Sequence, residues 1–197
     1  MTIGLLPVAL ALFVVAAAVA YFVFASFLYG AGYQPTPKAS ALEMLRLAEL
    51  SPRDTLYDLG AGTGALVFRA VRVYRARAVG VEVEPLRYLI LRLRRALGEG
   101  SERLTLRWGN LFDLSFRDAT VVTTFLWAGA MERLRPKFER ELPTGARVVS
   151  HCHPIPGWTA EVHDERTDVY LYRWPDARPA AAGEPTGGPR AAGTGGA

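Results

Sequence analysis

The sequence predicts an α/β domain built on a mostly parallel sheet, with a C-terminal antiparallel hairpin and one preceding N-terminal transmembrane helix. Three observations support this fold class. Short apolar runs alternate with amphipathic helix patterns between residues 55 and 152, two adjoining strand patterns follow them, and an uncharged apolar segment precedes them. Alternation of strands and helices is typical of a parallel sheet that helices cover on both faces.

Length and composition allow one folded domain with an extension at each end. The 197 residues have room for a single hydrophobic core, and half of them are hydrophobic. We expect residues 1–32 to form a transmembrane anchor and residues 33–174 to form the domain. Residues 175–197 are rich in Pro, Gly, Ala and Arg, and we expect them to be disordered.

The charge balance and the cysteine content restrict the surroundings of the protein. A formal net charge of +4 is compatible with nucleic acid or with an anionic membrane surface. The arginines are scattered along helix patterns without interleaved aromatic residues, which favours the membrane surface and argues against nucleic acid as a partner. Cys152 is the only cysteine, so no disulfide forms within the chain, as expected in a reducing compartment.

The N-terminal segment has the length and composition of a membrane-spanning helix. Residues 2–30 contain no charged side chain, and a helix over residues 5–28 would be about 36 Å long, enough to cross a hydrocarbon core. A cleaved signal peptide is the alternative, but no basic residue precedes the segment, and it exceeds the usual 7–15 apolar residues of such peptides. Lys38, Arg46 and later basic residues follow the segment, so the positive-inside rule predicts a single-pass membrane protein with its folded domain in the cytoplasm.

The folded domain is expected to begin with a stiff linker, Gln34-Pro35-Thr36-Pro37, followed by a helix. Ser40 is placed to cap this helix, with Glu43 as its capping-box partner. Strands are expected over residues 55–59, 78–83, 104–108, 121–126 and 147–152, and helices after Gly64, from Pro85 and over residues 130–142. Residues 159–165 and 167–174 are then expected to pair as an antiparallel hairpin at the sheet edge.

The helix that begins at Pro85 carries leucines and arginines at helical spacing. Its apolar positions are expected to form the buried stripe: Leu86, Leu89, Ile90, Leu93 and Leu97. The arginines are expected to form its solvated face: Arg87, Arg92, Arg94 and Arg95.

A glycine-rich turn, Asp58-Leu59-Gly60-Ala61-Gly62-Thr63-Gly64, joins the first strand to the next helix. Backbone amides at such a turn and at a helix N-terminus favour a polar or anionic group of a ligand. A carboxylate about 20 residues further along, at the end of the second strand, can accept hydrogen bonds from both hydroxyls of a ribose. Glu82 stands at this position; Glu84 is the near alternative, but it lies beyond the strand beside Pro85.

Glycine turns also connect strands to helices where no ligand binds, so the glycines alone do not identify a site. Two acidic residues favour a ligand. Asp58 stands at the end of a buried strand, where an unpaired carboxylate is costly, and Glu82 has the expected spacing. An acid before the first glycine suits a ligand with an ammonium group and would repel the pyrophosphate of a dinucleotide. The pattern therefore favours S-adenosyl-L-methionine.

These motifs resemble those of a known superfamily. Asp58 to Gly64 followed by Gly80-Val81-Glu82 is similar to the first two motifs of the class I, seven-strand methyltransferases, whose Rossmann-like sheet also ends in an antiparallel hairpin. The segments that narrow the resemblance are Tyr33-Gln34-Pro35-Thr36-Pro37, Leu134-Arg135-Pro136-Lys137 through Arg147-Val148-Val149-Ser150-His151, and Pro154-Ile155-Pro156-Gly157-Trp158. They are similar to the protein-lysine methyltransferase family that includes the mitochondrial enzyme acting on the ATP synthase c subunit and archaeal lysine methyltransferases.

The resemblance implies a membrane-tethered enzyme that transfers a methyl group from S-adenosyl-L-methionine to a lysine of a membrane-proximal protein. It implies the following cofactor contacts: Asp58, Gly60, Ala61, Gly62 and Gly64 around the methionine part, Glu82 at the ribose, Asn110 and Leu111 at the adenine edge, and Thr36 in a flap over the cofactor. Thr124, Phe125 and Trp127 would line the acceptor entrance. The family often has a tyrosine at the position of Phe125, so a role for that hydroxyl is absent here.

No catalytic side chain is assigned, because the sulfonium is already a good leaving group and the protein has only to align the amine and exclude water. No metal is expected either. His151 and His153 share a strand face, but no carboxylate cluster accompanies them in the sequence. Trp158 is compatible with a packed loop residue or with a wall of the substrate site.

Two other functions remain open from the sequence. The apolar N-terminal segment would also suit a methyltransferase that acts on a small or lipid-like molecule, such as a quinone intermediate. A membrane-bound interaction module that keeps the fold without catalysis is the third possibility.

Overall fold

A seven-stranded sheet forms the centre of the computed structural model, which describes residues 4–28, 34–99 and 102–177. The strands are β1 (Thr55–Leu59), β2 (Arg77–Glu82), β3 (Leu104–Trp108), β4 (Val121–Thr124), β5 (Arg147–His151), β6 (Val162–Asp164) and β7 (Val169–Arg173). The helices are α1 (Leu5–Leu28), α2 (Lys38–Leu47), α3 (Ala65–Arg72), α4 (Pro85–Arg94) and α5 (Ala128–Glu141), with short turns η1 (Arg95–Glu99) and η2 (Leu111–Asp113).

The strand order β3-β2-β1-β4-β5-β7-β6 places β1 and β4 side by side at the middle of the sheet. β1 to β5 are parallel, whereas β7 runs antiparallel to β5 and β6 runs antiparallel to β7. The α/β class, the parallel sheet and the closing hairpin expected from the sequence are therefore confirmed. The chain reverses its direction of strand addition between β1 and β4, and ligands of such sheets bind at the carboxyl ends beside this point.

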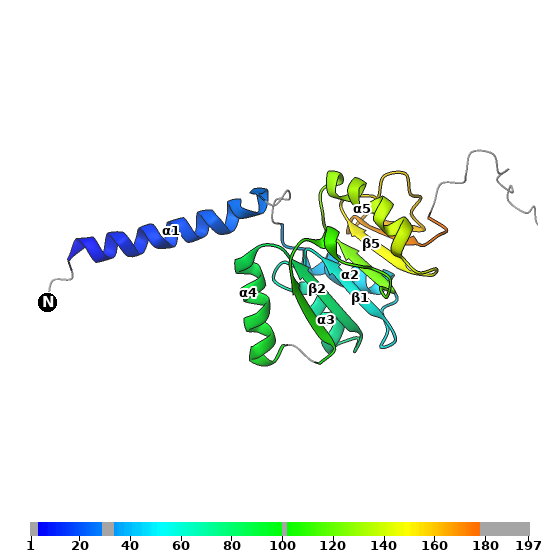
Figure 1. The fold of residues 1–197 in the computed structure, drawn as a ribbon, viewed down its shortest axis with the longest axis horizontal. Coiled ribbons are helices and arrows are strands. Elements are labelled where there is room, and N and C mark those ends of the chain that lie inside the picture. Colours follow the sequence, from blue (N-terminus) through cyan, green and yellow to red (C-terminus); the bar gives the residue numbers. More distant parts are fainter. Residues whose placement is uncertain (1–3, 29–33, 100–101, 178–197) are drawn as a thin grey trace, which may run out of the picture.

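Each face of the sheet has its own core, because successive side chains of a strand point to opposite faces. Leu56 of β1 packs with α2 and α3, whereas Tyr57 and Leu59 pack with residues of α5. Figure 1 shows α2, α3 and α4 on one side of the sheet and α5 on the other. Asp58 shares the face of Leu56, so its carboxyl group lies on the α3 side at the end of the strand.

The first helix of the domain starts differently from the capping box expected at Ser40. α2 begins at Lys38 after Pro37, which makes no side-chain cap. Ser40 instead lies within the helix and its hydroxyl donates to the backbone oxygen of Thr167, while Glu43 pairs with Arg46. Pro37 has the extended backbone that precedes a helix, and this allows the helix to start earlier than the capping motif indicated.

Helix α4 is turned relative to the expectation from its sequence. The predicted buried leucines Leu89, Leu93 and Leu97 are 50%, 53% and 83% exposed, whereas Leu91 is fully buried. Arg87, expected in solvent, is buried at the start of the helix. The expectation of a buried stripe and a solvated arginine face was wrong for these residues. Carboxylates at the end of β2 bind the Arg87 side chain, so they fix which side of α4 faces the sheet.

The exposure of Leu93 allows the orientation of α4 to be tested by a substitution. Replacing Leu93 with glutamine is expected to change the free energy of unfolding by less than about 1 kcal/mol, because the side chain is already half in water. A leucine in a buried stripe would cost about 2–5 kcal/mol on truncation. Urea unfolding of both proteins decides between the two, and a loss above about 2 kcal/mol would contradict the orientation described here.

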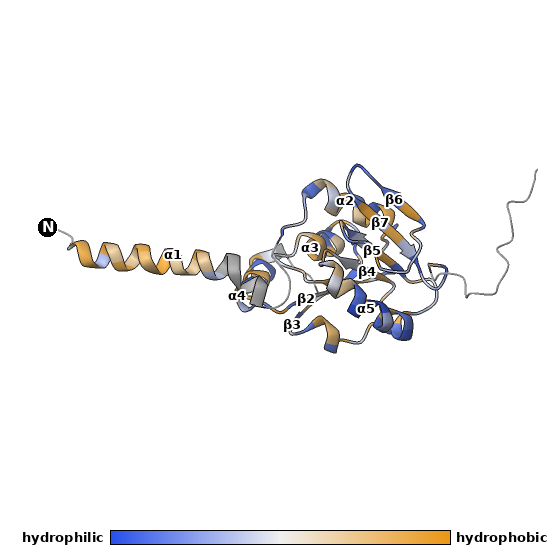
Figure 2. Cartoon of the chain, turned by 90° about the horizontal axis from the view of Figure 1, so that it is seen from above, coloured by the Kyte–Doolittle hydropathy of each residue, from blue (hydrophilic) through white to orange (hydrophobic). Residues whose placement is uncertain are grey.

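Helix α1 lies apart from the sheet (Figure 1), and its residues 5–21 are almost all hydrophobic (Figure 2). Among all described residues, no helix combines the length and the apolar character that membrane crossing requires. The predicted transmembrane anchor, and with it the single-pass placement with a cytoplasmic domain, was wrong on this finding.

The C-terminal side of the domain extends a few residues past the expected boundary at residue 174. Ala177 is buried, and its backbone oxygen accepts a hydrogen bond of 2.9 Å from the Thr159 N–H. Residues 175–177 therefore pack with the domain. The remainder of the predicted disordered tail, residues 178–197, lies outside the described residues, as do residues 29–33 at the predicted start of the domain.

Candidate active site

A cavity of about 720 Å³ opens at the carboxyl ends of the central strands. It is lined by the cofactor residues expected from the sequence except Gly64: Thr36, Asp58, Gly60, Ala61, Gly62, Glu82, Asn110 and Leu111. Phe125 and Trp127, expected at the acceptor entrance, line it too. The fold thus brings together segments before α2, after β1, after β3 and after β4, at the point where the sheet topology favours ligand binding.

The glycine turn is held down on β2 by backbone hydrogen bonds. The N–H groups of Gly60 and Ala61 both donate to the backbone oxygen of Val81, at 3.0 and 2.8 Å. Gly60 and Gly62 have φ angles of +85° and +55°, a region that residues with a Cβ rarely adopt. These contacts bring the backbone of the turn to the cavity wall beside the end of β2.

Gly64 has a different role from the other glycines of the turn. It precedes α3 with φ +92°, and a Cβ at this position would lie 2.4 Å from Cε2 of Phe68 and 2.7 Å from Cδ2 of Leu91. Gly64 therefore allows α3 and α4 to pack closely behind the turn and does not itself line the cavity.

Glu82 and Glu84 have separate positions at the end of β2. One carboxylate oxygen of Glu82 accepts from the Gly62 N–H at 2.8 Å and the other from the Glu84 N–H at 2.9 Å, and Glu82 lines the cavity. The Glu84 carboxylate caps α4 by accepting from the N–H groups of Leu86 and Arg87 at 2.9 and 2.7 Å. Because Glu84 is fully buried in this cap, only Glu82 of the two acids has its side chain at the cavity.

Arg87 joins the two acids. Its Nε lies 3.5 Å from a Glu82 oxygen and 3.6 Å from a Glu84 oxygen, and all three side chains are buried. Buried carboxylates are costly unless they are paired, and Arg87 supplies the positive charge between them. The arginine also lines the cavity, a position that the helix pattern of the sequence did not reveal.

Asp58 is a buried acid with a strongly raised pKa. Burial is the main cause and the charge of Glu82 adds to it, whereas the hydroxyl of Thr123, which donates to Asp58 at 2.9 Å, opposes it; the pKa of Asp58 is raised from 3.8 to about 7. The carboxyl group therefore sits at the cavity close to the point of ionisation at neutral pH. A cation bound beside it would favour the charged form.

The raised pKa of Asp58 makes the stability of the empty protein depend on pH. Between about pH 4 and pH 7 the folded protein holds a proton on Asp58 that the unfolded chain has lost, so this group's contribution to stability falls as the pH rises and is constant above pH 7. The slope is at most about 1.4 kcal/mol per pH unit. Asp58→Asn is expected to remove it. Urea unfolding of both proteins from pH 5 to pH 8 measures the difference, and parallel stability curves would contradict the raised pKa.

The far side of the cavity is formed by residues after β3 and on α5. The Asn110 carboxamide oxygen accepts from the Phe112 N–H at 3.1 Å and so starts the turn η2. The guanidinium of Arg133 lies over the Phe112 ring, 4.0 Å from its centroid. Arg133 and Phe112 both line the cavity, but the sequence did not identify them, because Arg133 belongs to an exposed helix face and Phe112 to the three-residue turn η2.

The residues expected at the acceptor entrance divide into two groups. Phe125 and Trp127, here called the acceptor rim, belong to the irregular segment between β4 and α5 and line the cavity. Thr124 is the last residue of β4, is fully buried, and its hydroxyl lies 3.6 Å from the sulfur of Met131, away from the cavity. Alternation along the strand turns Thr124 into the core.

Trp158, which the sequence left open between a packed residue and a substrate wall, packs in the core. It is 8% exposed, stacks on Trp174 with ring centroids 5.1 Å apart, and donates from Nε1 to Glu139 at 3.2 Å. It does not line the cavity. In the described ranges, no three His, Cys, Asp or Glu side chains come together as a metal site.

A solved structure with the same fold indicates what the cavity is for. The chain matches an RNA methyltransferase from Salinibacter ruber in complex with S-adenosyl-L-homocysteine with a TM-score of 0.71 and 35% identity, over 77% of this chain and 100% of that one. Together with the glycine turn and the acids at the ends of β1 and β2, this defines a class I methyltransferase that uses S-adenosyl-L-methionine.

Comparison with protein families narrows the class. Residues 58–162 match the model of the ANTKMT methyltransferase domain, and the chain belongs to this family. A protein-lysine N-methyltransferase of Saccharolobus islandicus is 38% identical over 152 residues, 71% of this chain and 91% of that protein. The mouse adenine nucleotide translocase lysine N-methyltransferase is 34% identical over 59% of this chain, which spans about half (52%) of that relative. The enzyme is thus a protein-lysine methyltransferase, as the sequence resemblance implied.

Proposed function

We propose that the enzyme methylates a lysine side chain of a membrane-proximal protein, with the cofactor at the glycine turn and the lysine entering past the acceptor rim. The observation that carries this arrangement is one cavity lined by two unlike sets of residues. The ionisable and backbone polar groups of Asp58, Gly62 and Glu82 are here called its polar end, and the aromatic side chains of Phe125 and Trp127 its aromatic end. A charged cofactor and an amine that must lose its hydration shell suit these two ends.

At the polar end, the residues present fit S-adenosyl-L-methionine. Asp58 would bind the ammonium of the methionine part, since a positive charge there compensates the buried carboxylate. Glu82 would accept hydrogen bonds from the ribose hydroxyls, with its orientation fixed by the N–H groups of Gly62 and Glu84. Asn110 and Leu111 would border the adenine, and Thr36 would cover the site from the segment before α2.

At the aromatic end, the chain has to align the amine and to exclude water. The bound cofactor supplies an activated methyl group on a positively charged sulfur. The acceptor rim would guide the uncharged lysine nitrogen toward that methyl group, and the proton of the amine would pass to solvent before transfer. Alignment of the reacting atoms can lower a barrier by about 7–11 kcal/mol, and the amine has already lost its proton to solvent, so no side chain is assigned as a general base.

Helix α1 supports an acceptor protein with an apolar surface. Leu5, Leu6 and Leu10 are 89%, 81% and 62% exposed, and apolar side chains surround the helix. Large exposed apolar surfaces mark interaction sites. A target protein close to a membrane would offer such surface, and the mouse relative is named for a lysine of adenine nucleotide translocase.

The acceptor class is tested by incubating the full chain with tritiated S-adenosyl-L-methionine and a membrane fraction of the source cells. Label in a protein band that yields methyl-lysine after acid hydrolysis is the expected result. Label recovered in the lipid extract would identify a lipid-like acceptor, and label in the RNA fraction an RNA acceptor; either would overturn the proposal. An Asp58→Asn/Glu82→Gln double variant serves as the control for transfer that does not depend on the cavity.

A further inference from the structure

A strained turn ends β5 beside the acceptor rim. The His153 N–H donates to the backbone oxygen of His151 at 2.8 Å, so three residues close a γ-turn with Cys152 at its centre. Cys152 has φ +62°, a conformation that is rare and strained for a residue with a side chain. The Ser150 hydroxyl donates to the His153 backbone oxygen, and the Cys152 N–H donates to the backbone oxygen of Asp168, the residue before β7, at 2.8 Å, so both sides of the turn are fixed.

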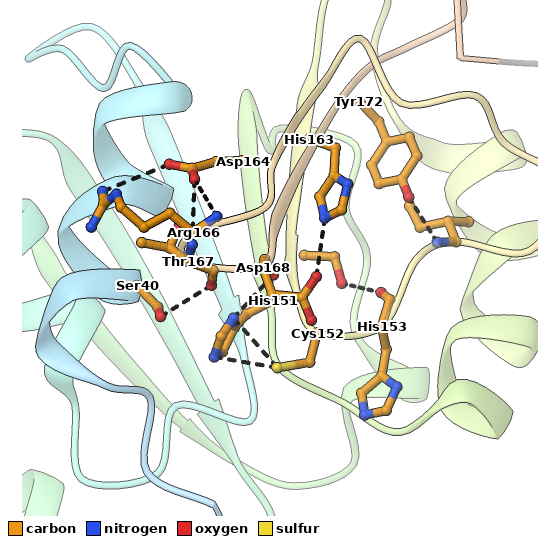
Figure 3. A network of polar contacts seen from close by, with 12 residues as sticks. Ser40, His151, Cys152, His153, His163, Asp164, Arg166, Thr167, Asp168 and Tyr172 are labelled. Carbon is orange, nitrogen blue, oxygen red and sulfur yellow. Dashed lines mark hydrogen bonds and ion pairs between the residues drawn. The ribbon is translucent and has the colours of Figure 1, made fainter.

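The turn sets two imidazole rings against the two rings of the acceptor rim. The centroid of the His151 ring lies 4.4 Å from that of Phe125. The His153 ring stacks on Trp127 with centroids 6.1 Å apart and planes 20° apart. Figure 3 shows His151, Cys152 and His153 in a network of polar contacts that also includes Asp168 and His163. Each residue of the rim therefore has a histidine partner from the same three-residue turn.

The His151 ring is held in a defined orientation. Its Nδ1 lies 3.1 Å from the backbone oxygen of Asp168, which can only accept, so Nδ1 carries a proton and donates. The sulfur of Cys152 lies 3.5 Å from Nε2 of His151. His151 is 5% exposed. These contacts fix the ring that supports Phe125 from behind.

The third histidine of the chain belongs to the same network without reaching the rim. His163 stacks on Tyr170 with centroids 4.0 Å apart, and its Nε2 lies 3.1 Å from a carboxylate oxygen of Asp168 (Figure 3). It thus shares Asp168 with His151 but has its ring partner on β7. This makes His163 a matched control for any effect of removing an imidazole from this network.

We propose that the Cys152 turn is a positioning device for the acceptor lysine: it holds His151 against Phe125 and His153 against Trp127, and so fixes the channel wall along which the lysine reaches the methyl group. The proposal rests on the proposed function, in which these two aromatic residues line the acceptor entrance. The backbone oxygen of Trp127 accepts from the N–H groups of Ala130 and Met131 at the start of α5, and the two histidine rings add contacts to the side chains of the rim, which has no strand pairing of its own. Small errors in the alignment of reacting atoms lower rates steeply, so a strained turn that fixes this wall would favour transfer.

The first test compares His151→Ala with His163→Ala in the full chain. His151→Ala is expected to lower kcat/KM for the protein acceptor at least tenfold, while the Kd for S-adenosyl-L-methionine stays within about twofold of the wild type. His163→Ala is expected to leave both quantities within about twofold. A parallel change in cofactor Kd, or equal losses in the two variants, would show that the network is merely structural and would overturn the proposal.

Two conservative variants separate the contact of the His151 ring with Phe125 from the hydrogen bond of His151 to Asp168. His151→Phe keeps an aromatic ring against Phe125 but loses the hydrogen bond to Asp168, whereas His151→Asn can keep the hydrogen bond but lacks the ring. Rescue of transfer by phenylalanine and not by asparagine is the expected result. Rescue by asparagine and not by phenylalanine would mean that His151 acts through its hydrogen bond to Asp168, and it would overturn the positioning role.

A double-mutant cycle between Trp127 and His153 uses positions where truncation is not expected to prevent folding. Trp127 is 48% exposed and His153 is half-buried, so Trp127→Ala, His153→Ala and the double variant are expected to fold. If His153 acts through Trp127, the double variant transfers methyl groups no more slowly than Trp127→Ala alone. Additive losses would contradict the proposal. A wild-type enzyme that labels no protein lysine would overturn the proposed function itself, whereas active wild type with unaffected His151 and His153 variants would overturn only the inference drawn here.

Discussion

Glu82→Ala is expected to weaken binding of S-adenosyl-L-methionine at least a hundredfold. Two hydrogen bonds from ribose hydroxyls to a carboxylate are each charge-assisted and contribute about 1.5–3 kcal/mol, which corresponds to a factor of 10² or more when both are lost. The substitution also removes the acceptor of the Gly62 N–H and one of the two acids beside Arg87. Isothermal titration calorimetry of the purified chain measures the change.

Glu82→Gln and a cofactor analogue distinguish lost ribose contacts from a disturbed glycine turn. The glutamine variant keeps a carbonyl oxygen for the Gly62 N–H and is expected to lose about tenfold in affinity. An analogue without ribose hydroxyls should bind the wild type weakly and bind Glu82→Ala no worse than the natural cofactor does. If the wild type binds both cofactors equally well, the assignment of Glu82 to the ribose fails.

Gly64→Ala is expected to destabilise the protein by roughly 2–5 kcal/mol. The left-handed backbone at φ +92° costs a residue with a Cβ about 1–2 kcal/mol, and forcing a methyl group into a packed core costs about 1–3 kcal/mol more. The new Cβ would meet Phe68 and Leu91, which are both buried and cannot withdraw into solvent. Thermal and urea unfolding report the loss.

Gly98→Ala separates the backbone contribution from the steric one. Gly98 has almost the same backbone angle, φ +91°, but no described atom lies within 4 Å of the position its Cβ would take. It is therefore expected to lose only the backbone part, about 1 kcal/mol. Equal losses in the two variants would mean that close packing of α3 and α4 does not explain the third glycine of the turn.

The order and type of the elements could be predicted from the sequence because local patterns determine them. Residues 55–59 and 104–108 are strands with the expected bounds, and the hairpin after β5 pairs as its two strand patterns indicated. The orientation of α4 could not be predicted, since leucines and arginines alternate around the helix and contacts distant in sequence decide which side is buried. The pairing of Arg87 with Glu82 and Glu84 reverses the hydrophobic pattern there.

In the candidate site, too, some residues could be predicted from the sequence and others could not. Asp58 and Glu82 could be found because a fixed spacing along two strands brings them to one edge of a parallel sheet. Arg133 and Phe112 could not, because they come together from an exposed helix face and the three-residue turn η2, where no periodicity marks them. Thr124 was expected at the entrance, but the alternation of β4 directs it to Met131. The membrane prediction rested on the composition of the N-terminal segment, and it was wrong because no described helix has the length and apolar character to cross a membrane.

The cavity draws its walls from parts of the chain that are far apart in sequence, from Thr36 before α2 to Arg133 on α5. The cofactor therefore requires these segments to be folded together. Bound cofactor then stabilises the folded state: at a free cofactor concentration a hundred times Kd, binding adds about 2.7 kcal/mol to the free energy of unfolding. The metabolic supply of S-adenosyl-L-methionine would thereby control how long the enzyme survives, as well as how fast it works.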